Sequence, residues 1–250
     1  MHKQITAELI FPFTDSNVFQ DHGFHRRGYQ LKQCSVSSLL YAATAVLSDI
    51  DYPLKSSDKS VSVVGSCFGL VCISFDTGKD LFLWNPCTKR SKNLHDSYME
   101  RKKCRFDLLG FGYDEVNYDY KAVRIRVKLG APFFGGGRLP YVTEVRVYSL
   151  KNDSWSRIRL CEDVVPSWGS GYFAGGNLHW VVATSGADSW KFLSFDLASE
   201  TYGEIEWPRS KDHLDDWSAG VLGGCLCVLY DYEKIDVDVW VMKEYGVKDS

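Results

Sequence analysis

Cysteine and histidine are the side chains that most often bind metals or act as nucleophile and base, and this chain has eight cysteines and six histidines. No two cysteines form a CxxC pair, and no histidines have the spacing of an HExxH helix or a zinc finger. We therefore expect no metal site and no cofactor. The first residues lack the charged start, apolar stretch and cleavage site of a secretory signal, which favours free thiols and a cytoplasmic or nuclear location.

Signatures of nucleotide and hydrolase chemistry are weak. The glycine spacing of residues 169–174 fits a dinucleotide-binding fingerprint, but a glycine-rich strand pattern follows where a phosphate site needs the N-terminus of a helix. Neither a GxxxxGK[ST] loop nor a GxSxG elbow occurs. The carboxylates that could pair as a glycosidase acid and base fall at predicted strand ends or turns, where acidic side chains commonly face solvent: Asp114, Glu115, Glu144 and Asp196. We expect a chain that binds without catalysing a reaction.

The composition is that of a folded chain of one or two domains. It has 250 residues, of which 45% are hydrophobic and 14% aromatic, enough to bury a substantial core. No apolar run approaches the ~18 residues of a membrane span, so no membrane partner is expected. The net charge of -3 disfavours binding of a polyanion such as nucleic acid by the protein as a whole.

Apolar and polar residues alternate along much of the chain with the two-residue period of β-strands, as in residues 122–127, 144–148 and 226–230. In four segments an aromatic residue ends an apolar strand, a polar turn follows, and a second strand pattern begins. These aromatic residues are 64, 47 and 45 residues apart: Trp84, Tyr148, Phe195 and Trp240. A period near 45 residues with glycine turns between strands is typical of a four-stranded propeller blade of roughly 40 to 50 residues.

The predicted fold class is therefore all-β, a kelch-like, β-propeller-like array of four-stranded antiparallel blades. We expect roughly ten or more strands and less than about 15% helix. The four recurring aromatic residues are expected to pack between neighbouring blades. Residues 36–47 leave helix and strand both open, because their leucines could share one helical face while the β-branched residues among them suit a strand.

Two connecting segments have the composition of a recognition surface. Residues 130–141 and 164–172 are rich in glycine, yet they carry aromatic and arginine side chains. Such side chains on a connection often dominate binding to a protein partner. The predicted target-binding residues are Phe133, Phe134, Arg138, Tyr141 and Trp168. The alternative for Phe133 and Phe134 is that they fold back onto the core.

A second predicted surface is electrostatic. Between Lys89 and Arg105 seven basic residues stand against two acidic ones, whereas residues 200–250 hold twelve acidic and five basic residues. Such polarity favours steering of a charged protein partner, and the alternative is a solvated connecting loop. Nucleic-acid binding is not expected, because aromatic residues for base stacking are few in the basic stretch. The predicted patch is Lys89, Arg90, Lys92, Arg101, Lys102, Lys103 and Arg105.

Seven motifs follow one another along the chain, at residues 65–72, 83–88, 110–114 with 119–124, 144–150 with 152–155, 176–180, 193–197 and 239–247. Together, and in this order, they resemble the F-box-associated region of plant F-box proteins, which include F-box/kelch-repeat-like and S-locus F-box-like proteins. The resemblance implies the substrate-recognition region of an SCF-type (cullin-RING) ubiquitin ligase. Such a module binds a target protein, and partner subunits transfer the ubiquitin.

The chain departs from the family pattern at both ends. Residues 1–40 contain no leucine- and proline-rich helical F-box, so we expect an N-terminal segment, residues 1–38, without a recognisable F-box. The propeller-like domain is expected to span residues 39–250 and to be incomplete at its C-terminus, with an edge strand near residues 236–242 lacking its usual partner. Docking to a ligase adaptor would need an F-box in the full-length product. A glycan- or small-ligand-binding propeller, with or without enzymatic activity, is the alternative function.

Overall fold

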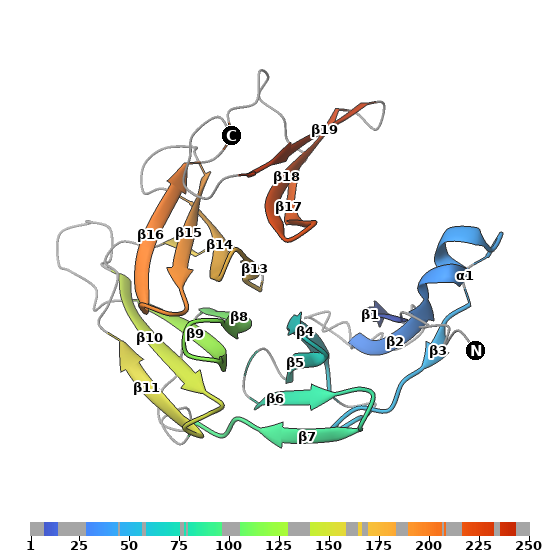
Figure 1. The fold of residues 1–250 in the computed structure, drawn as a ribbon, viewed down its shortest axis with the longest axis horizontal. Helices are drawn as coiled ribbons and strands as arrows, with labels where there is room; N and C mark the ends of the chain where they lie inside the picture. The colour runs from blue at the N-terminus through green and yellow to red at the C-terminus, as the bar shows by residue number, and fades with distance from the viewer. Residues whose placement is uncertain are drawn as a thin grey trace. The chain divides into compact units, whose positions relative to one another are not determined.

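The structure is a computed structural model that describes residues 8–14, 29–44, 46–56, 59–75, 78, 80–96, 106–129, 141–158, 165–166, 170–183, 190–206, 208, 217–232 and 236–243. These residues form 19 strands and one helix (Figure 1). All pairings between the named strands are antiparallel. The chain divides into two compact units, Met1–Ser97 and Tyr98–Ser250.

The first unit contains two sheets. Its strands are β1 (Glu8–Thr14), β2 (Tyr29–Ser35), β3 (Ser48–Asp49), β4 (Val61–Cys67), β5 (Leu70–Phe75), β6 (Asp80–Asn85) and β7 (Arg90–Asn93). The strand orders are β1-β2-β3 and β4-β5-β6-β7. Leu31 of β2 and Tyr52 share one hydrophobic core with Ile73 and Trp84 of the second sheet. This shared core holds the two sheets of the first unit together.

The segment at residues 36–47 begins as a helix. α1 (Val36–Tyr41) follows β2, and the hydroxyl oxygen of Ser35 caps it by accepting a hydrogen bond from the backbone nitrogen of Ser38 at 3.1 Å. The backbone is extended again at Ala42, and no residue of the helix is buried. The helical interpretation therefore holds for six residues of this segment. The expected domain boundary at residues 38 and 39 lies inside this helix.

The second unit contains three sheets. The first has the order β11-β10-β9-β8, with β8 (Phe106–Asp114), β9 (Asp119–Leu129), β10 (Tyr141–Ser149) and β11 (Ser154–Ile158). The second has the order β12-β14-β15-β16 with β13 also paired to β14, namely β12 (Val165–Pro166), β13 (Tyr172–Ala174), β14 (Asn177–Ala183), β15 (Trp190–Asp196) and β16 (Thr201–Glu206). The third has the order β17-β18-β19, with β17 (Trp217–Leu222), β18 (Cys225–Tyr232) and β19 (Asp236–Val241).

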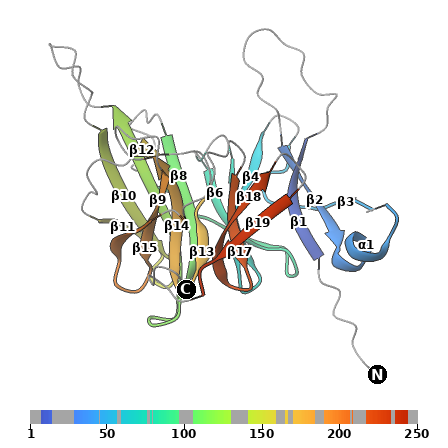
Figure 2. The ribbon, with the colours of Figure 1, turned by 90° about the horizontal axis from the view of Figure 1, so that it is seen from above.

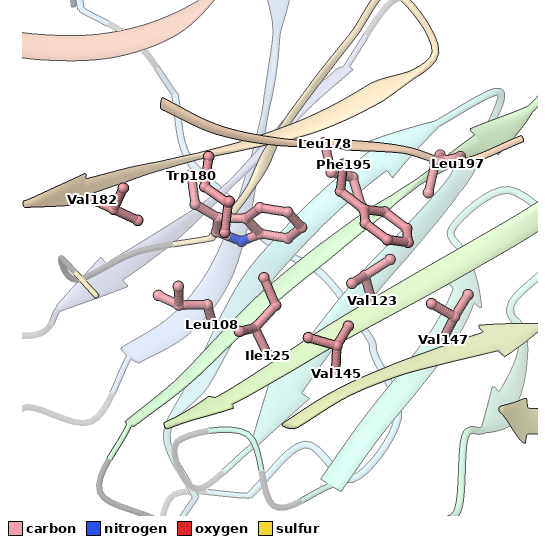
Figure 3. Close-up of a cluster of buried hydrophobic side chains, with 11 residues drawn as sticks. Leu108, Val123, Ile125, Val145, Val147, Leu178, Trp180, Val182, Phe195 and Leu197 are labelled. Carbon is pink, nitrogen blue, oxygen red and sulfur yellow. The ribbon is translucent and has the colours of Figure 1, made fainter. Parts of the chain in front are cut away.

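The sheets of the second unit pack face to face in chain order. Valines and isoleucine from β9 and β10 meet Leu178, Trp180 and Phe195 of the next sheet in one buried cluster (Figure 3). A second cluster joins Val181 and Phe192 to Val228 of the third sheet. Each inner face is apolar because every second residue of these strands is apolar, as the alternation in the sequence predicts. This is how successive blades of a propeller pack.

A polar side chain shapes the turn between the third and fourth strand of three sheets. The side-chain oxygens of Asn85, Ser149 and Asp196 each accept a hydrogen bond from the backbone nitrogen three residues later, at 2.9, 3.0 and 2.7 Å. Each turn ends on a residue with a positive φ: Lys89, Asp153 and Glu200. The same polar turn therefore recurs with the blade.

The prediction of an all-β, propeller-like array of antiparallel blades is confirmed. Three of the four recurring aromatic residues lie on the third strand of a sheet and are buried, with exposed fractions of 1% for Trp84, 2% for Tyr148 and 0% for Phe195. Trp240, on β19, is 49% exposed. The expectation that it packs in the core is wrong, because its sheet has three described strands and no described fourth strand covers it.

Candidate partner-binding end of the second unit

The connections of the second unit differ at the two ends of its sheets. At one end, here named the turn end, the strands join through short turns at residues 115–118, 150–153, 175–176 and 197–200. The Nζ of Lys121 on β9 donates a hydrogen bond to the main-chain oxygen of Leu197 at 2.6 Å, so the turn ends of the first two sheets lie side by side. The opposite end, here named the loop end, is reached by the longer connections.

Strand pairing places at the loop end the described residues that flank the predicted binding segments. Leu129 of β9 pairs with Tyr141 of β10, so residues 130–140 connect these strands at the end opposite to the turns. In the neighbouring sheet Pro166 pairs with Val182, near the end of β14, and residues 167–169 follow it. Figure 2 shows these strand ends on the side opposite to the turns of β15 and β16.

The predicted binding side chains themselves lie outside the described residues. Phe133, Phe134 and Arg138 belong to the connection between β9 and β10, and Trp168 follows β12. Tyr141 is the first residue of β10, and only its backbone is described. The structure therefore describes only the strand ends that flank the two predicted segments, and a role of these segments in binding stays a prediction.

The basic stretch is described only in part. Lys89 ends the turn between β6 and β7 with a φ of 57°, and Arg90 and Lys92 lie on β7, an edge strand of its sheet. Arg101, Lys102, Lys103 and Arg105 lie outside the described residues, in the second unit. The structure thus places three of the seven basic residues on one exposed turn and strand of the first unit.

The first sheet of the second unit carries a buried layer of charged side chains, here named the ionic layer, that was not predicted from the sequence. On the face of the first sheet of this unit opposite to its apolar core, Arg124 and Arg126 are each 1% exposed. The Nε of Arg126 lies 3.4 Å from the Oδ1 of Asp107, and the guanidinium of Arg124 lies 5.6 Å from the ring centre of Trp155. The guanidinium of Arg146 lies 5.9 Å from the same ring. Every second residue here is charged, a pattern that usually marks a solvent-exposed face.

The ionic layer suits a structural role better than a binding role. Buried arginines keep their charge, so each needs a carboxylate or a ring face nearby, and a slipped strand would separate these partners.

Within the described residues, no three histidine, cysteine, aspartate or glutamate side chains are grouped so that they could hold a metal ion. No described helix is long and apolar enough to cross a membrane.

Comparison with known proteins fits this architecture. The sequence model of the F-box associated beta propeller domain matches residues 28–249. The chain belongs to the F-box associated β-propeller family. It is 34% identical over 224 residues to the F-box/kelch-repeat protein At3g23880 of Arabidopsis thaliana, covering 87% of this chain and 58% of that protein. It is also 34% identical over 225 residues to the F-box protein CPR1 of the same plant, covering 82% of this chain and 54% of that protein. The chain thus spans little more than half the length of these relatives, and the resemblance to plant F-box proteins is confirmed.

The turn end of this F-box associated domain is fixed by a buried lysine. The Nζ of Lys121 lies 3.0 Å from carboxylate oxygens of both Asp114 and Glu200. Burial alone would lower the pKa of Lys121, but its bonds to Glu200 and Asp114 outweigh burial and raise the pKa. Burial would likewise raise the pKa of Asp114, yet hydrogen bonds from Asn117 and Lys121 lower it. Both groups are therefore charged at neutral pH, and Lys121 joins the first two sheets at their turns through Leu197 and Glu200.

The histidine of the second sheet, His179, also has a structural role. His179 on β14 is fully buried, and burial lowers its pKa to about 4 although a hydrogen bond with the main-chain oxygen of Ala174 opposes this. The ring is therefore neutral at physiological pH. Lys121, Asp114 and His179 thus all contribute to holding the fold together.

Proposed function

We propose that this chain recognises target proteins as the substrate-binding module of an SCF-type (cullin-RING) F-box ubiquitin ligase. Membership of the F-box associated family supports this, since the relatives are F-box proteins by name. The chain itself binds without catalysing a reaction, and ubiquitin transfer belongs to partner subunits. Docking to the ligase adaptor needs an F-box in the full-length product, and the module works in the cytoplasm or the nucleus.

The observation that carries the proposal is the one-sided distribution of connections in the second unit. The inner faces of its sheets are committed to packing, so variable recognition is assigned here to the connections between strands. At the turn end the connections are short, and the side chains of Asp114 and Asp196 accept hydrogen bonds from backbone nitrogens within them. Residues 130–140 and 167–169, which follow strand ends at the loop end, carry the aromatic and arginine side chains that commonly dominate protein interfaces.

A matched pair of variants tests the proposal. The loop-end variant changes Phe133, Phe134, Arg138 and Trp168 to serine, and the turn-end control changes Val116 and Tyr118, which are exposed, to serine. Partners would be captured from plant extract with the wild-type chain, identified by mass spectrometry, purified and titrated against each variant. The loop-end variant should keep its circular dichroism spectrum and melting temperature but lose most of the affinity, whereas the control should bind as the wild type does.

Two outcomes would count against this function. Full binding by the folded loop-end variant would discard the loop end and direct attention to Lys89, Arg90 and the rest of the basic stretch. Binding on a carbohydrate array in the absence of any protein partner would favour the glycan-binding alternative.

A further inference from the structure

The third sheet of the second unit ends on an edge strand. Among the described strands, β19 pairs only with β18, whereas β6, β10 and β15, the third strands of their sheets, each pair with a fourth strand. The consequence is visible at Trp240, which is 49% exposed although Trp84, Tyr148 and Phe195 at the equivalent position are at most 2% exposed. Within the described part of the chain, no strand pairs with the outer edge of β19 or covers the exposed half of the Trp240 indole.

The sequence directly after Trp240 differs from that of the other three sheets. The turn that leads to the fourth strand elsewhere depends on a side-chain oxygen one residue after the aromatic, at Asn85, Ser149 and Asp196. Val241 stands at this position after Trp240 and has no such oxygen. In the register of Tyr148 with Trp155, moreover, a returning strand would set Asp249 opposite Asp238, and like charges in that position destabilise a sheet.

The backbone of β19 offers hydrogen-bonding groups at this edge. The backbone nitrogen of Met242 donates to the main-chain oxygen of Leu226 on β18 at 2.9 Å. In an antiparallel pair the inward and outward groups alternate along the strand. The N–H and C=O groups of Val237, Val239 and Val241 therefore point away from β18.

The side chains of β19 define what could pair there. Asp236, Asp238 and Trp240 project to one face, and Val237, Val239 and Val241 to the other, since the strand alternates. Asp236, Asp238, Val237, Val239 and Trp240 are all exposed. The Oδ2 of Asp238 accepts a hydrogen bond from the hydroxyl of Tyr232 at 2.8 Å, which fixes the carboxylate on its face.

We propose that β19 is a docking edge for an extended segment of a partner protein in which lysine or arginine alternates with β-branched apolar residues. Pairing to Val237 and Val239 provides the main-chain bonds, and the basic side chains meet Asp236, Asp238 and the Trp240 ring on one face. The apolar residues of the segment cover the exposed valines on the other face. The excess of acidic residues within 200–250 favours the approach of such a segment. This surface does not include the loop-end residues 133, 134, 138 and 168, and it goes beyond the proposed function.

The test uses a fluorescein-labelled peptide, Lys-Val-Lys-Val-Lys-Val-Lys, and its counterpart with glutamate in place of lysine, titrated by fluorescence anisotropy against the full chain. Val239→Pro removes one outward N–H, and proline is tolerated on an edge strand when its position faces outward. We expect this variant to weaken binding of the lysine peptide on the order of tenfold or more. The matched control Val239→Thr keeps the N–H and the β-branch and should bind as the wild type does. Asp236→Asn with Asp238→Asn should weaken binding and flatten its dependence on salt, and remains informative if Val239→Pro fails to fold.

Several outcomes would overturn the docking edge. Equal binding of the glutamate peptide, or unchanged binding by folded Val239→Pro, would exclude pairing at β19. Binding by a chain that ends at Lys243 but not by the full chain would show that the chain's own residues occupy the edge. The loop-end variant with serine at positions 133, 134, 138 and 168 should keep full peptide binding, so failure of this proposal and failure of the proposed function are distinguishable.

Discussion

The indole Nε1 of Trp180 donates a hydrogen bond to the main-chain oxygen of Leu109 at 3.0 Å and so joins β14 to β8 of the preceding sheet. The backbone nitrogen of Gly171 donates to the same oxygen at 2.6 Å. A β-carbon added at either Gly110 or Gly171 would lie 2.7 Å from an atom of the Trp180 ring. The ring therefore fits between two glycines, and this close approach positions two blades against each other.

Removing the Trp180 side chain should be among the most damaging core changes in the second unit. Trp180→Ala should lower the free energy of unfolding by about 3 to 5 kcal/mol, because a buried aromatic leaves a cavity. Trp180→Phe keeps most of the apolar volume but leaves the Leu109 oxygen with one bond fewer, so a smaller loss of about 1 to 3 kcal/mol is expected. Urea unfolding followed by circular dichroism measures both.

The loss of stability on changing tryptophan to alanine should differ between the buried Trp84 and the half-exposed Trp240. Trp84→Ala should cost about as much as Trp180→Ala, whereas Trp240→Ala should change stability by less than about 1 kcal/mol because its ring is half exposed. A loss at Trp240 equal to that at Trp84 would show that the ring is covered in solution.

Substitution of the glycines around Trp180 should act through crowding. Gly110→Ala places a β-carbon 2.7 Å from Trp180 Cζ2 and 2.9 Å from Leu178 Cδ1, and should destabilise the chain by about 1 to 3 kcal/mol. Gly203→Ala is the matched control, since Gly203 also lies in a strand but has no atom within 4 Å of an added β-carbon. Melting temperatures should fall for the first variant and stay level or rise for the second. Equal effects would argue against the close packing of β8 on β14.

The ion pair of Asp114 with Lys121 should make stability depend on acid pH. The pKa of Asp114 is lowered from 3.8 in the folded chain, so its contribution is complete above that value and is lost as the pH falls through the folded pKa. Asp114→Asn should therefore cost about 3 kcal/mol at pH 7, a value typical of breaking a buried pair, and the difference from the wild type should shrink below pH 3.8. Urea unfolding at several pH values measures this difference. The control Glu115→Gln, at an exposed neighbouring residue, should change neither the free energy of unfolding at pH 7 nor its dependence on pH.

His179 should destabilise the fold in mild acid. Its pKa falls from 6.5 to about 4 on folding, so the unfolded chain binds more protons between these values and the free energy of unfolding decreases as the pH drops through them. The full shift corresponds to about 3 kcal/mol. His179→Gln should remove this part of the slope, and His95→Gln, at an exposed position, should leave it in place. An unaltered slope in His179→Gln would mean that the ring is not buried as the structure has it.

The strands, the recurring blade and the family could all be predicted from the sequence, because each rests on local patterns. Alternation with a period of two predicts a strand wherever it occurs, and a polar residue after the third-strand aromatic predicts the turn that follows. Asn85, Ser149 and Asp196 form those turns through bonds to residues only three positions away. No distant contact is needed to make them.

What only the tertiary structure decided is which of these similar positions are buried, and by what. Trp240 ends an apolar strand pattern as Trp84 does, yet it is half exposed on an edge strand, because its burial depends on a neighbouring fourth strand and not on the strand that carries it. Arg124 and Arg126 alternate as exposed charges would, yet they are buried beside Asp107 and Trp155. Alternation separates the two faces of a strand, but only the packing of neighbouring sheets determines which face water reaches.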